Sequence, residues 1–126
     1  MLPNRLRISK HATDTLKVLK SRTGVTPNLV CRTALAISLE EGAAAGDRPT
    51  DLEGSEFNLA TLFGDNVRVY ECLIRQVHGH IEGRSLNVVI AAHIDSGLER
   101  LKKSRSLLDL VRHAGIGTSE VAALIR

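Results

Sequence analysis

The chain opens with alternating apolar and polar positions that predict a short β-strand. Leu6 and Ile8 point to one face of such a strand. Arg5, Arg7 and Ser9 point to the other. Ser9 is also a suitable N-cap for a helix that begins at the next residue. We therefore expect a strand with one basic face and one face that packs on a core.

Apolar positions at helical spacing then predict two helices. The first covers about residues 10–22 and buries Ala12, Leu16 and Leu19. Thr26 followed by Pro27 marks the start of the second, which ends before Gly42. This second helix is apolar round much of its circumference and needs partners on more than one side. Either a central position in the fold or an oligomer interface would supply them.

The rest of the chain predicts further helices separated by polar breaks. Residues 43–58 are rich in Gly, Ala and acidic residues and indicate a loop, and residues 78–84 indicate a polar connection. The expected helices cover residues 67–78, 85–103 and 104–113. Asp65 or Asn66 would cap the first, and the third would begin at Ser104. The apolar seam of the second consists of Val89, Ile90, Ile94, Leu98 and Leu101.

We expect one compact, mainly α-helical domain with a short N-terminal strand. It spans residues 1–126, as a strand–helix–helix unit (1–42), an acidic loop (43–58), a helical remainder (59–113) and a tail (114–126). The order of elements in 1–42 resembles the ribbon-helix-helix fold, although that family is usually much shorter and dimerises through its strand. Because the chain has one Tyr, two Phe and no Trp, its core must be aliphatic. For the same reason, few aromatic side chains are available to stack on nucleic-acid bases.

Charge is strongly segregated behind a net charge of +3. Residues 1–38 carry seven Lys or Arg and one acid, whereas residues 39–66 carry seven acids and one Arg. This asymmetry indicates a basic face that could bind nucleic acid, although charge on solvated helices explains such counts equally well. Lys10, Lys17 and Lys20 fall on the arc of the first helix opposite its apolar stripe.

We expect a DNA interface that neutralises the phosphate backbone. The N-terminus of the second helix, after Thr26, could anchor a further phosphate. A different interpretation is a ribbon-helix-helix regulator that reads base edges with Arg5, Arg7 and Ser9, and a third is a scaffold that binds no DNA. The phosphate contacts are assigned first to Lys10, Lys17, Lys20 and Arg22, and second to Arg5, Arg7, Lys102, Lys103 and Arg105.

Candidate chemistry beyond binding is sparse. His78, His80, Glu82 and His93 could suggest a metal site, but two of the histidines fall in an expected loop and His93 in an apolar helix, where a packing role is commoner. No motif for nucleotide binding or hydrolysis occurs.

Cys31 and Cys72 are 41 positions apart, and we expect both to be reduced packing residues. We therefore expect no catalysis, metal or cofactor, and a cytoplasmic protein without signal peptide or membrane span.

The chain resembles the DndE family of the bacterial DNA phosphorothioation (DNA sulfur modification) system from Leu6 to Leu110. The resemblance rests on four segments, which are Leu6–Ser9, Thr23–Asn28, Thr61–Gly64 and Ala92–Leu98. It implies a protein without catalytic machinery that binds double-stranded DNA, preferring nicked duplex, through surface lysines of a homotetramer. It also implies partners, namely the sulfur-transfer and ATPase proteins of the modification complex, which a cysteine desulfurase supplies with sulfur.

Overall fold

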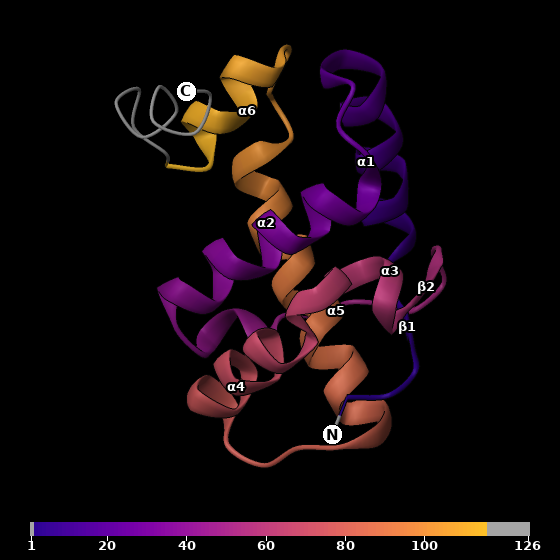
Figure 1. The fold of residues 1–126 in the computed structure, drawn as a ribbon, viewed down its shortest axis with the longest axis vertical. Coiled ribbons are helices and arrows are strands. Elements are labelled where there is room, and N and C mark those ends of the chain that lie inside the picture. The colour runs from indigo at the N-terminus through magenta and orange to yellow at the C-terminus, as the bar shows by residue number, and fades with distance from the viewer. Residues whose placement is uncertain (1, 116–126) are drawn as a thin grey trace.

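The structure is a computed structural model, and it describes residues 2–115. It is mainly helical with a short N-terminal strand, as predicted (Figure 1). Residues 116–126, most of the expected tail, lie outside the described part of the chain. The elements are β1 (Arg5–Arg7), α1 (Lys10–Thr23), α2 (Pro27–Glu41), the 3₁₀-helix η1 (Ala44–Asp47), β2 (Glu56–Asn58), α3 (Leu59–Phe63), the 3₁₀-helix η2 (Gly64–Asn66), α4 (Val67–His78), α5 (Gly83–Leu101) and α6 (Leu107–His113).

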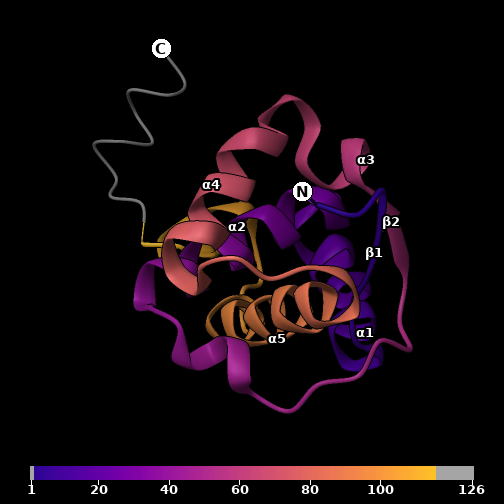
Figure 2. The same ribbon diagram turned by 90° about the horizontal axis from the view of Figure 1, so that it is seen from below.

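The long helix α5 forms the centre of the fold, with α1, α2 and α4 around it (Figure 2). Its main neighbour is α2, and the two backbones approach closely at Gly97. A Cβ atom at Gly97 would lie 2.0 Å from the carbonyl oxygen of Ala34. Seven residues of α2 are buried within this single chain. The wide apolar surface of α2 is therefore largely covered within the chain, with Leu29 as an exception at 45% exposure.

The strand β1 pairs with a second strand from its own chain. β2 lies antiparallel to it in the register Arg5–Asn58, Leu6–Phe57 and Arg7–Glu56. The expectation of a loop throughout residues 43–58 is therefore wrong, since η1 and β2 both fall within it. The pairing joins segments about fifty residues apart in the sequence, so no local sequence pattern predicts it. It also occupies one edge of β1, the strand through which ribbon-helix-helix proteins dimerise.

Ser9 does not share the exposed face of Arg5 and Arg7, contrary to the expected alternation. β1 ends at Arg7, and Ser9 is buried at the start of α1. Its hydroxyl accepts a hydrogen bond from the Ala12 N–H at 2.9 Å, as predicted for an N-cap, and donates to Asp95 Oδ1 at 2.6 Å. A residue with both bonds satisfied inside the protein is not available to read base edges.

The short helix α3 was not expected and is held by side chains from α2. Asn58 caps it by accepting from the Thr61 N–H at 2.7 Å. Asn28 and Arg32 each donate to the Thr61 carbonyl at 3.1 Å, and Arg32 also donates to the carbonyl of Leu62. These bonds satisfy carbonyls at the end of α3 that no helical N–H can reach.

The boundaries of the other helices differ from prediction by only a few residues. α2 and α4 match the expected ranges, whereas α5 begins two residues earlier than expected, at Gly83, and ends at Leu101. α6 begins at Leu107 with Ser106 as its cap, not at Ser104. Ser104 is instead buried, with its hydroxyl 2.8 Å from His113 Nδ1. The last turn of each helix is the least determined by local sequence.

The two cysteines differ in environment. Cys31 is buried in the core, and desolvation raises the pKa of its thiol to about 12. It is an inert packing residue, as expected. Cys72 is exposed on α4, so the expectation that it packs in the core is wrong. The apolar residues near Cys72 in the sequence do not all mark a buried face of α4, since Ile74 is buried but Val69 and Leu73 are exposed.

Candidate nucleic-acid interface

Three lysines of α1 form an exposed cationic surface, called here the lysine face: Lys10, Lys17 and Lys20. The opposite side of α1 buries Ala12, Leu16 and Leu19, so the helix can only present these lysines to solvent. Within residues 2–115, none of the three forms a salt bridge. The pKa of Asp51 is lowered mainly by backbone hydrogen bonds from Glu53 and Lys10, and the charge of Lys10 contributes to this lowering. Lys17 and Lys20 are therefore the members of the lysine face that are most free to pair with an external anion.

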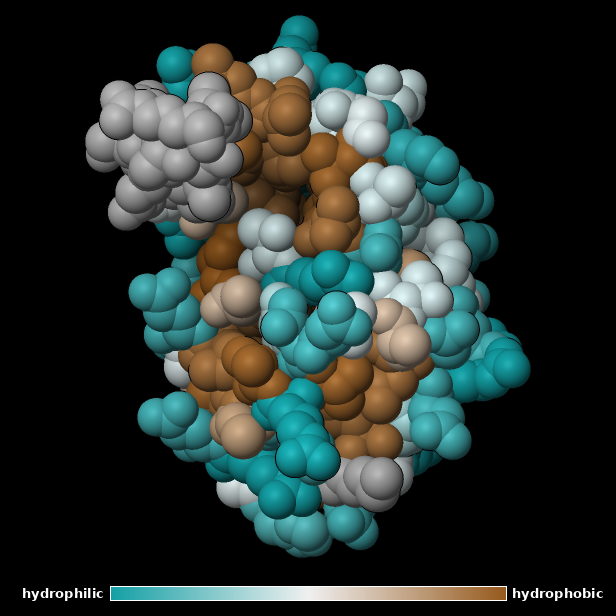
Figure 3. Space-filling model, viewed as in Figure 1, coloured by the Kyte–Doolittle hydropathy of each residue, from teal (hydrophilic) through white to brown (hydrophobic). Residues whose placement is uncertain are grey.

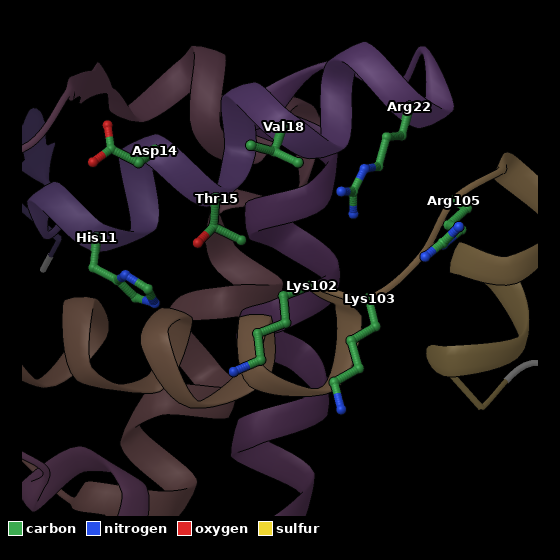
Figure 4. A pocket seen from close by; sticks show the side chains of 8 residues that line it. All are labelled: His11, Asp14, Thr15, Val18, Arg22, Lys102, Lys103 and Arg105. Atoms are coloured by element: carbon green, nitrogen blue, oxygen red, sulfur yellow. The ribbon is translucent and has the colours of Figure 1, made fainter.

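Arg22 lies apart from the lysine face, in an open cavity of about 650 Å³ between α1 and the segment that joins α5 to α6 (Figure 4). Lys102, Lys103 and Arg105 line the same cavity from the other side. Four of the predicted cations thus meet although they lie some eighty residues apart in sequence. We call this cavity the basic groove; its remaining lining residues are His11, Asp14, Thr15 and Val18.

A tight backbone turn positions the cations of the α5–α6 segment. The Lys102 N–H donates to the Leu98 carbonyl at 2.8 Å, and the Ser104 N–H donates to the Leu101 carbonyl at 3.0 Å. Ser104 is buried and fixes the turn through its hydroxyl. The N–H of Arg105 donates to Asp109 Oδ2 at 3.3 Å. With its serine buried, the turn directs the side chains on both sides outward.

The cations of the basic groove are not equally available. Lys102 Nζ lies 2.6 Å from Glu99 Oε2, and this hydrogen bond is the main reason that the pKa of Glu99 is lowered. Arg22, Lys103 and Arg105 form no salt bridge within the described part of the chain. In Figure 4, Arg22 of α1 and Arg105 of the α5–α6 segment lie at the same end of the groove, and Arg22 extends into it. Like charges gathered at one end of a groove are stabilised by a bound anion.

Arg5 and Arg7 lie in different surroundings. Both face Glu56 of β2, with N–O distances of 3.2 and 3.8 Å. They line a second open cavity of about 810 Å³ that also contains Asp51 and Glu53. The acidic segment thus balances the arginines of β1, and the structure does not bring them together with the basic groove.

Two of the four metal-ligand candidates form a buried polar chain. His93 is fully buried, and its Nδ1 lies 2.6 Å from Ser38 Oγ. Its Nε2 lies 2.6 Å from Nε2 of His78, which is the last residue of α4 and not part of a loop. Burial, and then the proximity of His78, lowers the pKa of His93 to about 4. The prediction of a packing role for His93 is confirmed.

The chemistry that the described residues offer is mainly electrostatic. His80 and Glu82 pair with each other at the surface, 3.4 Å apart, away from the buried chain. Within residues 2–115, no group of three or more His, Cys, Asp or Glu side chains could hold a metal ion. No helix in the same range is long and apolar enough to cross a membrane.

A small helical protein whose described part carries two cationic surfaces, most of whose charges form no salt bridge there, belongs to the class of proteins suited to bind polyanions. Comparison with known families makes the assignment specific, because residues 5–109 match the model of the DNA sulphur modification protein DndE. The chain therefore belongs to the DndE family and to the machinery of DNA phosphorothioation.

Solved structures support this assignment. The crystal structure of DndE from Escherichia coli B7A, involved in DNA phosphorothioation modification, is 31% identical with a TM-score of 0.70, over 78% of this chain and 97% of that one. The crystal structure of a DndE mutant involved in DNA phosphorothioation is 28% identical with a TM-score of 0.69, over 79% and 97% of the two chains. A search of curated proteins gave no match.

Proposed function

We propose that this protein is a non-enzymatic, cytoplasmic subunit of the DNA phosphorothioation complex that binds the backbone of double-stranded DNA, with preference for nicked duplex. Other proteins of the complex are its partners, and it assembles as a homotetramer. The observation that carries the DNA-binding proposal is the lysine face, which is exposed and unpaired within residues 2–115. The residues that could suggest catalysis support a structural role instead, since Ser38, His93 and Cys31 are buried.

The lysine face suits a backbone contact in its dimensions. Lys10 and Lys20 are ten residues apart on one helix, which corresponds to about 15 Å along its axis. Long, flexible ammonium side chains over that length can each reach a different phosphate. Because phosphates repeat regardless of sequence, such a surface binds without base readout. Each lysine that engages a phosphate releases condensed counterions, so affinity falls as salt rises.

The test measures binding of intact and nicked duplex across a salt series. We expect the double variant Lys17→Ala, Lys20→Ala to bind at least tenfold more weakly at low salt and to reduce the slope of log K against log salt by about 2. Arg68→Ala, Arg84→Ala is the matched control, because it removes two exposed cations from α4 and α5 and should have little effect. Nicked duplex should bind more tightly than intact duplex.

Three results would contradict the proposal. Unchanged binding by the lysine variant would exclude the lysine face as the site. A strong preference for one sequence over random competitor would indicate a regulator that reads bases. Failure of the wild type to bind any duplex at low salt would indicate a scaffold that docks proteins only.

A further inference from the structure

We propose that the basic groove binds an acidic, amphipathic segment of a partner protein. The segment would place an apolar side chain against Val18 and carboxylates against Arg22, Lys103 and Arg105. This inference goes beyond DNA binding and assigns the groove to a protein ligand.

The surface inside the groove distinguishes it from a phosphate-tracking surface. Most of the surface exposed within the cavity is apolar, although four cations line it. Val18 is 45% exposed in the middle of α1, between the two sets of charges. The phosphate backbone of duplex DNA has nothing to gain from an apolar floor, whereas a leucine or phenylalanine of a protein ligand buries area there. The floor therefore favours a protein.

The charges of the groove define the complementary ligand. Arg22 and Arg105 lie at the same end of the groove, and neither has a carboxylate partner within residues 2–115. Guanidinium groups bind carboxylates in a two-point geometry that also fixes orientation. Asp14 lies at the end of the groove away from Arg105 in Figure 4. The ligand's carboxylates should consequently lie at the Arg105 end.

The groove also has a suitable size and its own side of α1. Its volume of about 650 Å³ accommodates a few side chains of a docked segment. Val18 and Arg22 are four residues apart and share one line along the helix, whereas Lys17 is turned by about 100° from Val18. The lysine face and the groove can therefore be occupied at the same time.

The experiment compares two probes and three variants by fluorescence anisotropy at about 0.1 M salt, where the Debye length is about 10 Å. One probe is a labelled synthetic helical peptide with leucines on one face and glutamates on the rest; its control has lysine in place of glutamate. The other probe is an intact duplex. The groove variant is Arg22→Glu, Arg105→Glu, the matched control is Lys17→Glu, Lys20→Glu, and the third variant is Val18→Ser.

We expect the groove variant to weaken peptide binding at least tenfold and to weaken duplex binding clearly less than the lysine variant does, since reversal of two charges near the lysine face lowers only the general attraction for DNA. The lysine variant should show the opposite pattern. Val18→Ser should weaken the peptide severalfold and leave the duplex unchanged, and the lysine-containing peptide should not bind. Circular dichroism of each variant checks that the helices are intact.

The inference is overturned if the wild type does not bind the acidic peptide, or if the groove variant leaves peptide binding unchanged. It is equally overturned if the groove variant loses duplex binding as completely as the lysine variant does, because the groove would then belong to the DNA surface. The expected peptide pattern without any duplex binding would support the groove assignment and contradict only the proposed DNA function.

Discussion

Asp95 shows how a single buried carboxylate joins three segments of this chain. It lies on α5, and its two oxygens accept hydrogen bonds from Ser9 at the start of α1 and from Thr50 in the loop after η1. The Ser9 hydroxyl in turn accepts from the first turn of α1. The sequence predicted Ser9 as a helix cap, but not its bond to Asp95. That contact depends on how α1 packs against α5, which no local pattern encodes.

Replacement of Asp95 by alanine should destabilise the protein by about 2–4 kcal/mol, because hydrogen bonds to a charged group are strong and two hydroxyls lose their acceptor. Urea denaturation followed by circular dichroism measures the change. Asp65→Ala removes an exposed carboxylate from η2 and is expected to change stability by less than about 0.5 kcal/mol. Equal effects of the two substitutions would show that the Asp95 network does not stabilise the fold.

His93 should make stability depend on mildly acidic pH. Its pKa in the folded protein is about 4, below the ordinary value of 6.5, so the unfolded chain takes up a proton before the native protein does. The free energy of unfolding therefore falls as pH decreases from about 6.5 toward 4, and His93 alone should contribute a loss of roughly 2 kcal/mol between pH 7 and pH 5.

The test of this pH effect compares urea denaturation of the wild type and of His93→Gln at both pH values. Glutamine keeps a polar partner for Ser38 but does not titrate. The variant should lose less stability on acidification than the wild type does. Identical losses in both proteins would exclude His93 as the source.

At the scale of elements, the sequence predicted those helix ends and buried faces that a local sequence pattern marks. Ser9, the Thr26–Pro27 pair and Gly42 marked helix ends correctly, and the apolar spacing identified the buried sides of α1 and α5. β2 and α3 were missed because each depends on a distant partner, β1 in one case and Arg32 in the other. The exposed cations were visible too. Their division into a lysine face, a basic groove and a balanced pair on β1 followed only from tertiary packing.

The crossing of α2 and α5 should tolerate no side chain at Gly97. The atom that a new Cβ would meet is a backbone oxygen of α2, so relief requires a shift of a whole helix. We expect Gly97→Ala to destabilise the protein by about 3 kcal/mol despite the better helix propensity of alanine. Thermal unfolding measures this, with Ser96→Ala on the same helix as the control. A stabilised Gly97→Ala variant would show that the helices are less closely packed than the structure indicates.

At the scale of the whole molecule, the apolar surface left for assembly is limited. Seven residues of α2 are buried within the chain, and β1 is paired with β2. Exposed apolar side chains occur on α4, where Val69 is 56% exposed, and on α6 (Figure 3). A shallow cavity beside Leu73 adds residues of α2 to the α4 surface. These faces are the available candidates for contacts between copies.

We expect light scattering to give the mass of four chains for the wild type and a lower mass for Val69→Glu, Leu73→Glu, because two buried carboxylates would oppose association. Leu107→Glu, Leu108→Glu places the same charges on α6 and serves as the comparison. If only the α6 variant dissociates, the contact between copies is on α6. A monomeric wild type would contradict the proposed tetramer.

The position of Lys17 directly before Val18 has a consequence for regulation. One rigid helix carries the proposed DNA surface on one side and the proposed protein-binding groove on the next, so neither ligand can shift α1 without altering the site of the other. Thermodynamic linkage then requires reciprocity. If binding of the partner segment changes the affinity for DNA by some factor, binding of DNA changes the affinity for the partner segment by the same factor. Binding of this protein to DNA and its binding to the modification complex would then be thermodynamically coupled.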